Sequence, residues 1–405
     1  METAAAPSAR SIALLSCAAF ASAASLRVCD PLLPRIAETF AATTGDAARV
    51  VSVFAVAYGV LQAFYGPLGD HFGKYRLVAV ATLACTAVCI AAALAQTLSA
   101  LVVFRALGGA TAAAIIPLSI AWIGDTIPYD KRQATLARFI SGQILGVIGG
   151  QFIGGLFADT LGWRWSFAAL ALIFLIVAGL LFAEHARNDA VRAGAGTSGT
   201  IVSRAPFLAQ ALGILRSRWA PVVLLTVFLE GIAVFGALAF IPSFLHLRFG
   251  ISLTAAGAIL AVFGLGGLAY TSFAARLVAS IGEQGLALGG GIGLGVGFLA
   301  LALANSWAWA IPACFAIGLG FYMLHNTLQT NATQMAPSAR GTAVSFFASA
   351  YYLGQALGVA AASRIVDEHD TRTLFVIATA SLPLVGGGFA YALRRVVRDN
   401  ARSPS

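Results

Sequence analysis

Long runs of apolar residues, separated by short polar segments, follow one another along nearly the whole chain. A helix needs roughly 20 apolar residues to cross a hydrocarbon core of about 30 Å, and most of these runs reach that length. Membrane-spanning β-strands are short and alternate in polarity, so long apolar runs predict helices. The polar interruptions predict twelve spans, near residues 11–33, 47–68, 77–97, 99–122, 134–158, 163–183, 219–244, 254–279, 284–304, 307–330, 341–363 and 373–393.

One polar stretch, residues 184–218, is much longer than the other interruptions and divides the chain into two sets of six spans. Its segment Gly194–Thr200 reads GAGTSGT, a composition typical of flexible linkers. We therefore expect an N-terminal six-helix bundle over residues 1–183, a cytoplasmic linker over 184–218, and a C-terminal six-helix bundle over 219–405.

The two halves also carry similar residues at a nearly constant separation. Arg132, Gly146 and Gly150 recur 208 residues later as Arg340, Gly354 and Gly358, and Leu68, Gly73 and Leu77 recur 209 residues later as Leu277, Gly282 and Leu286. A duplicated unit is common among transporters whose site lies between the halves at mid-depth. The sequence thus predicts an all-α membrane protein with twelve transmembrane helices in two pseudo-symmetric six-helix bundles.

Composition and charge support the membrane assignment. Of the 405 residues, 59% are hydrophobic and 10% are charged, whereas soluble domains carry about 25% charged residues. The net charge of +9 does not indicate nucleic acid, because no basic stripe carries interleaved aromatic residues. Most Lys and Arg residues fall in the segments on one side of the predicted spans, which predicts an inner-membrane protein with both termini in the cytoplasm. The apolar run after Arg10 resembles a secretory signal, but we expect it to remain as the first span because further spans follow.

The segment 66–77, between the second and third spans, reads GPLGDHFGKYRL. Its glycines allow two helix ends to approach closely, and its charges can bond between helices. It resembles the GxLxDRxGRR signature of the major facilitator superfamily and departs from it at His71 and Tyr75. The resemblance implies a gating loop, without substrate contact, that holds the cytoplasmic side closed in the outward-facing state. That loop would comprise Gly66, Asp70, Gly73, Lys74 and Arg76, with Asp125 at the end of span four.

Two charged positions within spans carry further resemblances. Segment 101–109, LVVFRALGG, is similar to the RxxQG pattern of the family's span four, with Gly108 in place of Gln. Arg105 in this segment must face a partner or a wet cavity, or extend from the helix end toward the interface. Segment 27–34, RVCDPLLP, resembles the twelve-helix drug:proton antiporter branch. Arg27 and Asp30, three residues apart, can pair on one helix face, either for coupling or as a structural ion pair.

Span five contains glycines at close spacing. The residues Gly146, Gly150, Gln151, Gly154 and Gly155 resemble the antiporter signature GxxxGPxxGG, with Gln151 in place of Pro. The resemblance implies export by exchange. Small residues four apart also serve ordinary close packing of helices, so both interpretations stay open.

Candidate coupling groups are few, because only Asp30 and Glu230 among the acidic residues fall within the predicted spans. A low-dielectric site disfavours the charged form of a carboxylate, so such a group can alternate between protonated and ionised states. Glu230 is the first candidate for a proton or cation site, and Asp30, with Arg27 and Arg105, is the second; a buried structural acid is the alternative. His325 is a further candidate, because histidine changes charge nearest to neutral pH.

Polar stripes on two spans are candidates for lining a cavity or for hydrogen bonding between helices. They comprise Tyr58, Gln62 and Tyr65 in span two, and Tyr322, Asn326 and Gln329 near His325 in span ten.

We assign no function to several other patterns. The glycine-rich segment 289–297 follows no strand, and residues 367–370 read better as a solvated loop than as metal ligands. No HExxH, GxSxG or Walker pattern occurs, so we expect no enzyme, cofactor or metal site. We expect a proton-coupled secondary transporter, a monomer in the lipid bilayer, that exports drug-like molecules or metabolites by alternating access. Proton-driven uptake of a nutrient and a non-transporting membrane sensor are the alternatives.

Overall fold

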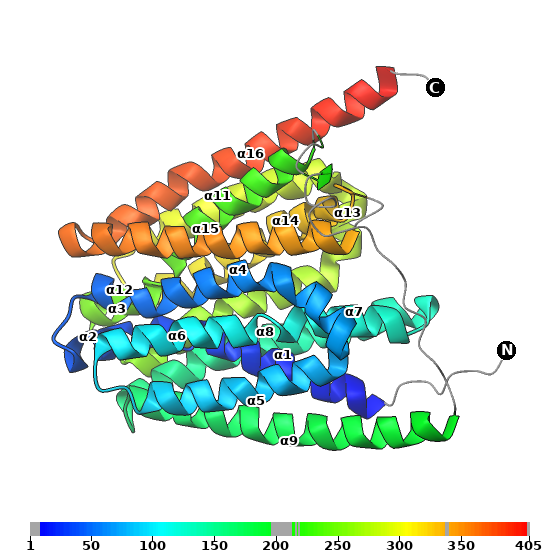
Figure 1. The fold of residues 1–405 in the computed structure, drawn as a ribbon. Helices are drawn as coiled ribbons and strands as arrows, with labels where there is room; N and C mark the ends of the chain where they lie inside the picture. The colour runs from blue at the N-terminus through cyan, green and yellow to red at the C-terminus, as the bar shows by residue number, and fades with distance from the viewer. Residues whose placement is uncertain (1–8, 196–212, 215–216, 218, 337–339, 403–405) are drawn as a thin grey trace.

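The computed structural model describes residues 9–195, 213–214, 217, 219–336 and 340–402 (Figure 1). These residues form helices and connecting segments, without a strand. The helices of the N-terminal half are α1 (Ala9–Arg27), η1 (Asp30–Leu32), α2 (Leu33–Thr39), α3 (Thr44–Ala47), α4 (Arg49–Phe72), α5 (Lys74–Ala93), α6 (Leu98–Ala112), α7 (Ile115–Thr126), α8 (Tyr129–Asp159) and α9 (Trp163–Ala195). Those of the C-terminal half are α11 (Ala220–Leu238), α12 (Ile241–Phe249), α13 (Leu253–Ala302), η2 (Trp307–Trp309), α14 (Ala310–Ala332), α15 (Arg340–Glu368) and α16 (Arg372–Arg402).

Within the described residues, eleven helical segments are long and apolar enough to cross a membrane. The longest, α13, has 50 residues and covers two of the predicted spans. At Gly282 its backbone leaves the helical region, with φ 64° and ψ 179°, a conformation that glycine adopts without steric cost. The chain turns there, because Gly267 before the break and Gly290 after it both lie against α14, at Tyr322 and Gly320 respectively.

Gly73, 209 residues before Gly282, occupies the equivalent break between α4 and α5 with φ 87°. Both turns therefore use a glycine with a positive φ, a conformation that other residues rarely adopt. Helix α9 continues to Ala195, into the expected linker; residues 196–212 of that linker, and residues 337–339 of the repeated segment around Arg340, lie outside the described residues.

The helices run roughly along one common direction (Figure 1). Helix α1 begins and α16 ends at the same end of the bundle, which we call the proximal end. The short helices α2, α3 and α12 lie at the opposite end, which we call the distal end. Large apolar side chains are exposed on the surface, among them Leu384 (75%), Leu303 (72%) and Leu247 (68%). Lipid can solvate such side chains at no cost, whereas water cannot, so the molecule is a multi-pass membrane protein.

Helix pairs in the two halves pack in the same way. A Cβ atom built on Gly146 of α8 would lie 2.3 Å from the Phe20 carbonyl oxygen of α1. A Cβ atom on Gly354 of α15 would lie 2.2 Å from the Phe228 carbonyl oxygen of α11. Gly354 and Phe228 each follow their counterparts by 208 residues. The repeat in the sequence therefore extends to the packing partners of its glycines.

The halves meet through α8 against α13 and through α4 against α15. Gly155 of α8 approaches the Leu253 carbonyl oxygen so closely that an added Cβ would lie 2.3 Å away. A Cβ on Gly59 of α4 would lie 2.9 Å from the Tyr352 Cβ of α15. Gly155 and Leu253 lie near the distal ends of their helices. Gly59 and Tyr352 lie near the middle of theirs, so close contact between the halves extends from the distal end to the middle of the bundle.

Candidate functional site

Glu230 and His325, which lie 95 residues apart in the sequence, face each other between α11 and α14. Glu230 is fully buried, and its Oε2 lies 2.8 Å from the Nδ1 atom of His325. The other carboxylate oxygen, Oε1, has no hydrogen-bond partner among the described residues. The pair thus places a carboxylate and an imidazole, two groups that exchange protons, in direct contact away from water.

Aromatic rings surround this pair. The His325 imidazole stacks on Phe321 at a centroid distance of 4.8 Å, and Tyr351 and Phe347 of α15 lie 4.7 and 5.3 Å from it. The side chain of His325 is 15% exposed. The three rings cover most of the imidazole, and its remaining exposure leaves a path for proton exchange.

Arg27, at the end of α1, connects the N-terminal half to the C-terminal half. It is 3% exposed. Its Nη2 donates a hydrogen bond to Gln355 Oε1 of α15 at 3.1 Å, and its guanidinium lies 4.1 Å from the Phe235 ring centroid of α11. A charged hydrogen bond and a cation–π contact both stabilise a buried guanidinium. This arginine therefore holds α1 against α11 and α15.

Asp30 lies beside Arg27, with Oδ2 3.8 Å from Arg27 Nη1. It is fully buried, and neither of its oxygens has a hydrogen-bond partner among the described residues. Buried polar groups are normally hydrogen-bonded, so this loosely paired carboxylate is a group with spare bonding capacity for a proton or a ligand cation.

Phe235 links the two charged pairs. Its ring lies 5.5 Å from Phe321, which stacks on His325, and it also contacts the guanidinium of Arg27. The structure thus gathers four of the five predicted coupling candidates in one region. We call this region the central cluster; it comprises Arg27, Asp30, Glu230, His325 and Gln355, with Phe235, Phe321 and Tyr351 between them.

The fifth candidate, Arg105 of α6, does not extend toward the interface. It is 3% exposed, and its Nε and Nη1 donate to the carbonyl oxygens of Val50 and Ser25 at 3.1 and 3.0 Å. Its guanidinium also lies 4.0 Å from the Phe54 ring centroid. Arg105 therefore joins α6 to α4 and α1 through backbone atoms, and its part in coupling stays a prediction.

The stripe on α4 divides between two environments. Tyr58 is buried against Tyr352 of the other half, with centroids 4.4 Å apart, and the buried Gln62 has an Oε1 without a partner among the described residues. Tyr65 donates to the Ala110 carbonyl oxygen at 2.7 Å, within its own half. Tyr58 therefore faces the other half, whereas Tyr65 bonds within its own half.

The stripe on α14 also divides. Tyr322 is half-buried and its ring centroid lies 6.1 Å from that of Phe263. Asn326 is half-buried next to His325, whereas Gln329 is exposed. The ring centroid of Tyr322 also lies 5.2 Å from that of Phe321, so this stripe adjoins the central cluster at Tyr322 and not at the exposed Gln329.

Three of the predicted gating residues, Asp70, Lys74 and Asp125, meet at the proximal end. Lys74 Nζ lies 2.9 Å from Asp70 Oδ1 and forms a second ion pair with Asp125 of α7. Gly69 packs so closely on Leu118 that an added Cβ would lie 2.4 Å from it. Gly66 has open space around it, and Arg76 is exposed. Lys74 thus ties the ends of α4 and α7 to the start of α5.

The glycines of the antiporter-like segment serve close packing. Added Cβ atoms on Gly150 and Gly154 would lie 2.4 and 2.3 Å from the carbonyl oxygens of Ala24 in α1 and of Val28 just after it. Gln151 is fully buried, and neither polar atom of its side chain has a partner among the described residues. Because Gly354 and Gly358 make equivalent contacts in the other half, these contacts do not by themselves indicate a direction of transport.

Sequence reasoning missed two buried polar groups. Glu184 is 1% exposed and accepts a hydrogen bond from Ser11 at 2.9 Å. The prediction that only Asp30 and Glu230 are acids within spans was wrong, because α9, the helix of the sixth predicted span, continues past the expected boundary at residue 183. Gln355, fully buried, was overlooked although a polar residue in a membrane helix is itself a signal.

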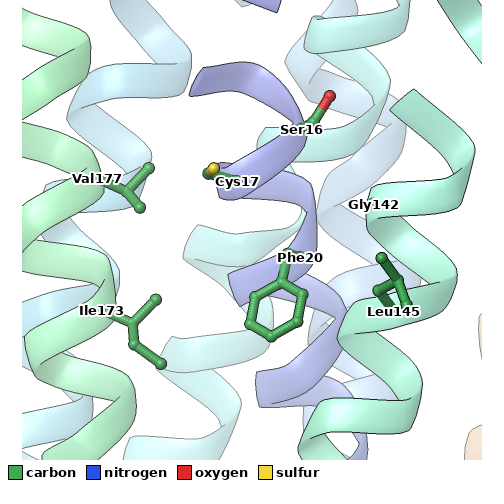
Figure 2. Close-up of a pocket in the computed structure, with 7 residues that line it drawn as sticks. All are labelled: Ser16, Cys17, Phe20, Gly142, Leu145, Ile173 and Val177. Carbon is green, nitrogen blue, oxygen red and sulfur yellow. The ribbon is translucent and has the colours of Figure 1, made fainter. Parts of the chain in front are cut away.

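A cleft of about 300 Å³ lies elsewhere, between α1, α8 and α9 (Figure 2). Apolar side chains such as Phe20, Leu145 and Ile173 line it, and it includes none of the central cluster. No three His, Cys, Asp or Glu side chains in the described parts of the chain converge as metal ligands.

Comparisons with known proteins give a consistent result. The model of the Major Facilitator Superfamily matches residues 15–400. An uncharacterized MFS-type transporter of Bacillus subtilis, YwfA, is 27% identical over 347 residues, covering 85% of this chain and 83% of that protein. The multidrug export protein EmrB of Haemophilus influenzae is 30% identical over 153 residues, covering 38% of this chain and 30% of that protein. The solved structure of the nucleoside transporter NupG has a TM-score of 0.76 at 12% identity, covering 94% of this chain and 98% of that one.

Proposed function

The chain belongs to the Major Facilitator Superfamily, and we propose that it is a proton-coupled secondary transporter that exports small organic molecules by alternating access. Twelve transmembrane helices in two six-helix bundles would result if the break at Gly282 divides α13 into two spans, since residues 253–281 and 283–302 are each long enough to cross the bilayer. We place both termini in the cytoplasm of a monomer in the inner membrane, with the distal end facing outward.

The contact between Glu230 and His325 carries the proton-coupling proposal. A carboxylate withdrawn from water loses the hydration that favours its charged form, and a neighbouring imidazole can take or return its proton. Glu230 lies on α11 and His325 on α14, so a shift of one helix against the other changes their contact. Proton binding is then linked to the arrangement of the helices.

Two features support a site between the halves. Arg27 of the N-terminal half contacts Gln355 and Phe235 of the C-terminal half, so rocking of the halves changes its surroundings. Asp30 beside it has unused acceptor oxygens. A ligand that enters this region meets carboxylates and aromatic rings, which together favour an amphipathic cation. Export is supported by the relative named as a multidrug export protein.

The test uses purified protein in liposomes with an imposed gradient of two pH units and ethidium as the amphipathic cation. Exchange of one proton for one monovalent cation permits a concentration ratio of up to about 100, since each pH unit corresponds to a factor of ten. Glu230→Gln keeps the size of the side chain and an acceptor for His325 but cannot release a proton. In Glu230→Gln we expect the ethidium concentration ratio to fall toward one, while exchange of ethidium in the absence of a pH gradient continues.

Glu184→Gln is the matched control, because Glu184 is also buried but lies in α9, outside the central cluster. We expect this variant to keep proton-driven accumulation. Unchanged accumulation in Glu230→Gln would contradict the role of Glu230. If ethidium moves in the same direction as the protons and not in the opposite direction, the protein is an uptake symporter. A thermal-shift screen of other small molecules supplies further probes, because a ligand that binds only the folded state stabilises it.

A further inference from the structure

Two aspartates at the distal end occupy equivalent positions in the repeat. Asp159 is the last residue of α8, and Asp367 is next to last in α15, 208 residues later. Each lies in one half and accepts hydrogen bonds from the other half. Neither takes part in the central cluster or in the gating loop.

Asp159 caps the start of α13. Its Oδ2 accepts hydrogen bonds from the Thr254 amide at 2.6 Å and from the Thr254 hydroxyl at 2.7 Å. The N-cap residue Ser252 accepts from the Ala255 amide at 3.1 Å. The aspartate of the N-terminal half therefore completes the N-terminus of a helix in the C-terminal half.

Asp367 makes the equivalent contact in the opposite direction. Its Oδ1 accepts from the Gly45 amide at 3.0 Å, and its Oδ2 accepts from the Thr43 hydroxyl at 2.7 Å. Thr43 is itself the N-cap residue of α3 and accepts from the Asp46 amide at 2.9 Å. A Cβ on Gly45 would lie 2.2 Å from Asp367 Oδ2, so only glycine admits the carboxylate there.

The two arrangements match in register. Each carboxylate takes the amide two positions after the N-cap residue, Gly45 after Thr43 and Thr254 after Ser252, and these pairs are 209 residues apart. Carboxylates are favoured at helix N-termini because they accept from otherwise unpaired amides and meet the positive end of the helix dipole. Two equivalent, reciprocal contacts of this kind are better explained by a shared task than by chance packing.

We propose that Asp159 and Asp367 form a pair of aspartate caps that hold the outer ends of the two halves together, and that both caps release when the transporter opens outward. The proposal rests on the alternating-access function proposed above. Water can replace each partner of a cap, since carboxylates and helix N-termini are both well hydrated when exposed. The caps therefore bias the equilibrium toward the closed distal end without preventing its opening.

The expected size of the effect follows from capping energetics. Loss of one N-terminal cap changes an equilibrium by about fivefold, and loss of both by about 25-fold if they act independently. An outward-open state populated at about 2% would then rise to about one third in the doubly substituted protein. Such a change is large enough to observe directly.

The experiment measures the distance between the halves at the distal end with spin labels at Leu161 and Leu303, which are 62% and 72% exposed. Cys17 is replaced by Ser, because it is exposed while the other four cysteines are buried. Labelled protein is measured in lipid nanodiscs by double electron–electron resonance, without substrate or a pH gradient. This readout is independent of proton coupling and of transport direction, so its failure is distinct from failure of the proposed function.

We expect the long-distance population to increase in D159A and in D367A, and most in D159A/D367A. The variant D159N/D367N keeps an acceptor oxygen at each site and should resemble the parent. D370A is the matched control, because Asp370 accepts from the Arg372 amide at the start of α16, within its own half. If the double variant fails to fold, the single variants decide, since each keeps one cap. Distance distributions that superpose on the parent's, or an equal shift in D370A, would overturn the proposal.

Discussion

Alanine in place of Gly146 tests whether the glycines of the antiporter-like segment act through helix packing. The added Cβ would lie 2.3 Å from the carbonyl oxygen and 2.8 Å from the Cα of Phe20. Both are backbone atoms of α1, so no rotation of a side chain relieves the clash. Helices α1 and α8 must instead separate along their crossing.

The size of this separation sets the cost. An ordinary contact begins near 3.4 Å, so the backbones must move apart by about 1 Å. Overpacking of this kind costs about 1–3 kcal/mol, whereas alanine in place of glycine inside a helix gains about 1 kcal/mol. The net expectation is a loss of stability of about 0–2 kcal/mol. Gly354→Ala should cost the same, because its Cβ meets the Phe228 carbonyl oxygen at 2.2 Å.

The assay is reversible unfolding in mixed micelles at increasing mole fractions of dodecyl sulfate. Gly179→Ala in α9 is the matched control, because no atom lies within 4 Å of its added Cβ, and it should stabilise the protein by up to about 1 kcal/mol. A result in which Gly146→Ala and Gly179→Ala change the free energy of unfolding in the same direction and by similar amounts would refute the packing argument.

Two other substitutions test charged residues outside the central cluster. Arg105→Lys should lower the free energy of unfolding by about 1–3 kcal/mol, because one ammonium group cannot reproduce the paired bonds to Ser25 and Val50. Unfolding in mixed micelles measures this change, and a decrease below about 0.5 kcal/mol would contradict the prediction. Lys74→Met should change the free energy of unfolding by about 1 kcal/mol or less, since the partners of Lys74 are half-exposed. If the contact to Asp125 is part of the gate, the same substitution should strongly reduce ethidium accumulation in liposomes. Undiminished accumulation would exclude a gating role for this contact.

Much of the fold could be predicted from the sequence. The long apolar runs predicted membrane helices, and the comparisons confirm the family suggested by segment 66–77. Helix ends were less accurate: α9 runs to Ala195 rather than 183, which moved Glu184 from a loop into a buried position. Hydropathy marks where a chain can leave the hydrocarbon, but a helix ends only where capping or packing stops it.

The candidate site could be predicted only in part from the sequence. Rarity of acids in apolar segments singled out Glu230 and Asp30, and helical spacing singled out the pair Arg27 and Asp30. The spacing gave no indication that His325 contacts Glu230, because the two lie on different helices. Nor did it indicate that Arg105 binds the backbone carbonyl oxygens of Val50 and Ser25.

By itself the sequence determined that this chain resides in lipid, that it is built from helices and that its halves are related, because the length and periodicity of apolar runs are local properties. The tertiary structure alone decided which polar groups meet. Gln355 reaches Arg27, His325 reaches Glu230, and Asp367 reaches Gly45 only after helices distant in sequence have packed together. A buried polar group must find a partner wherever the packing offers one, and no local pattern encodes that choice.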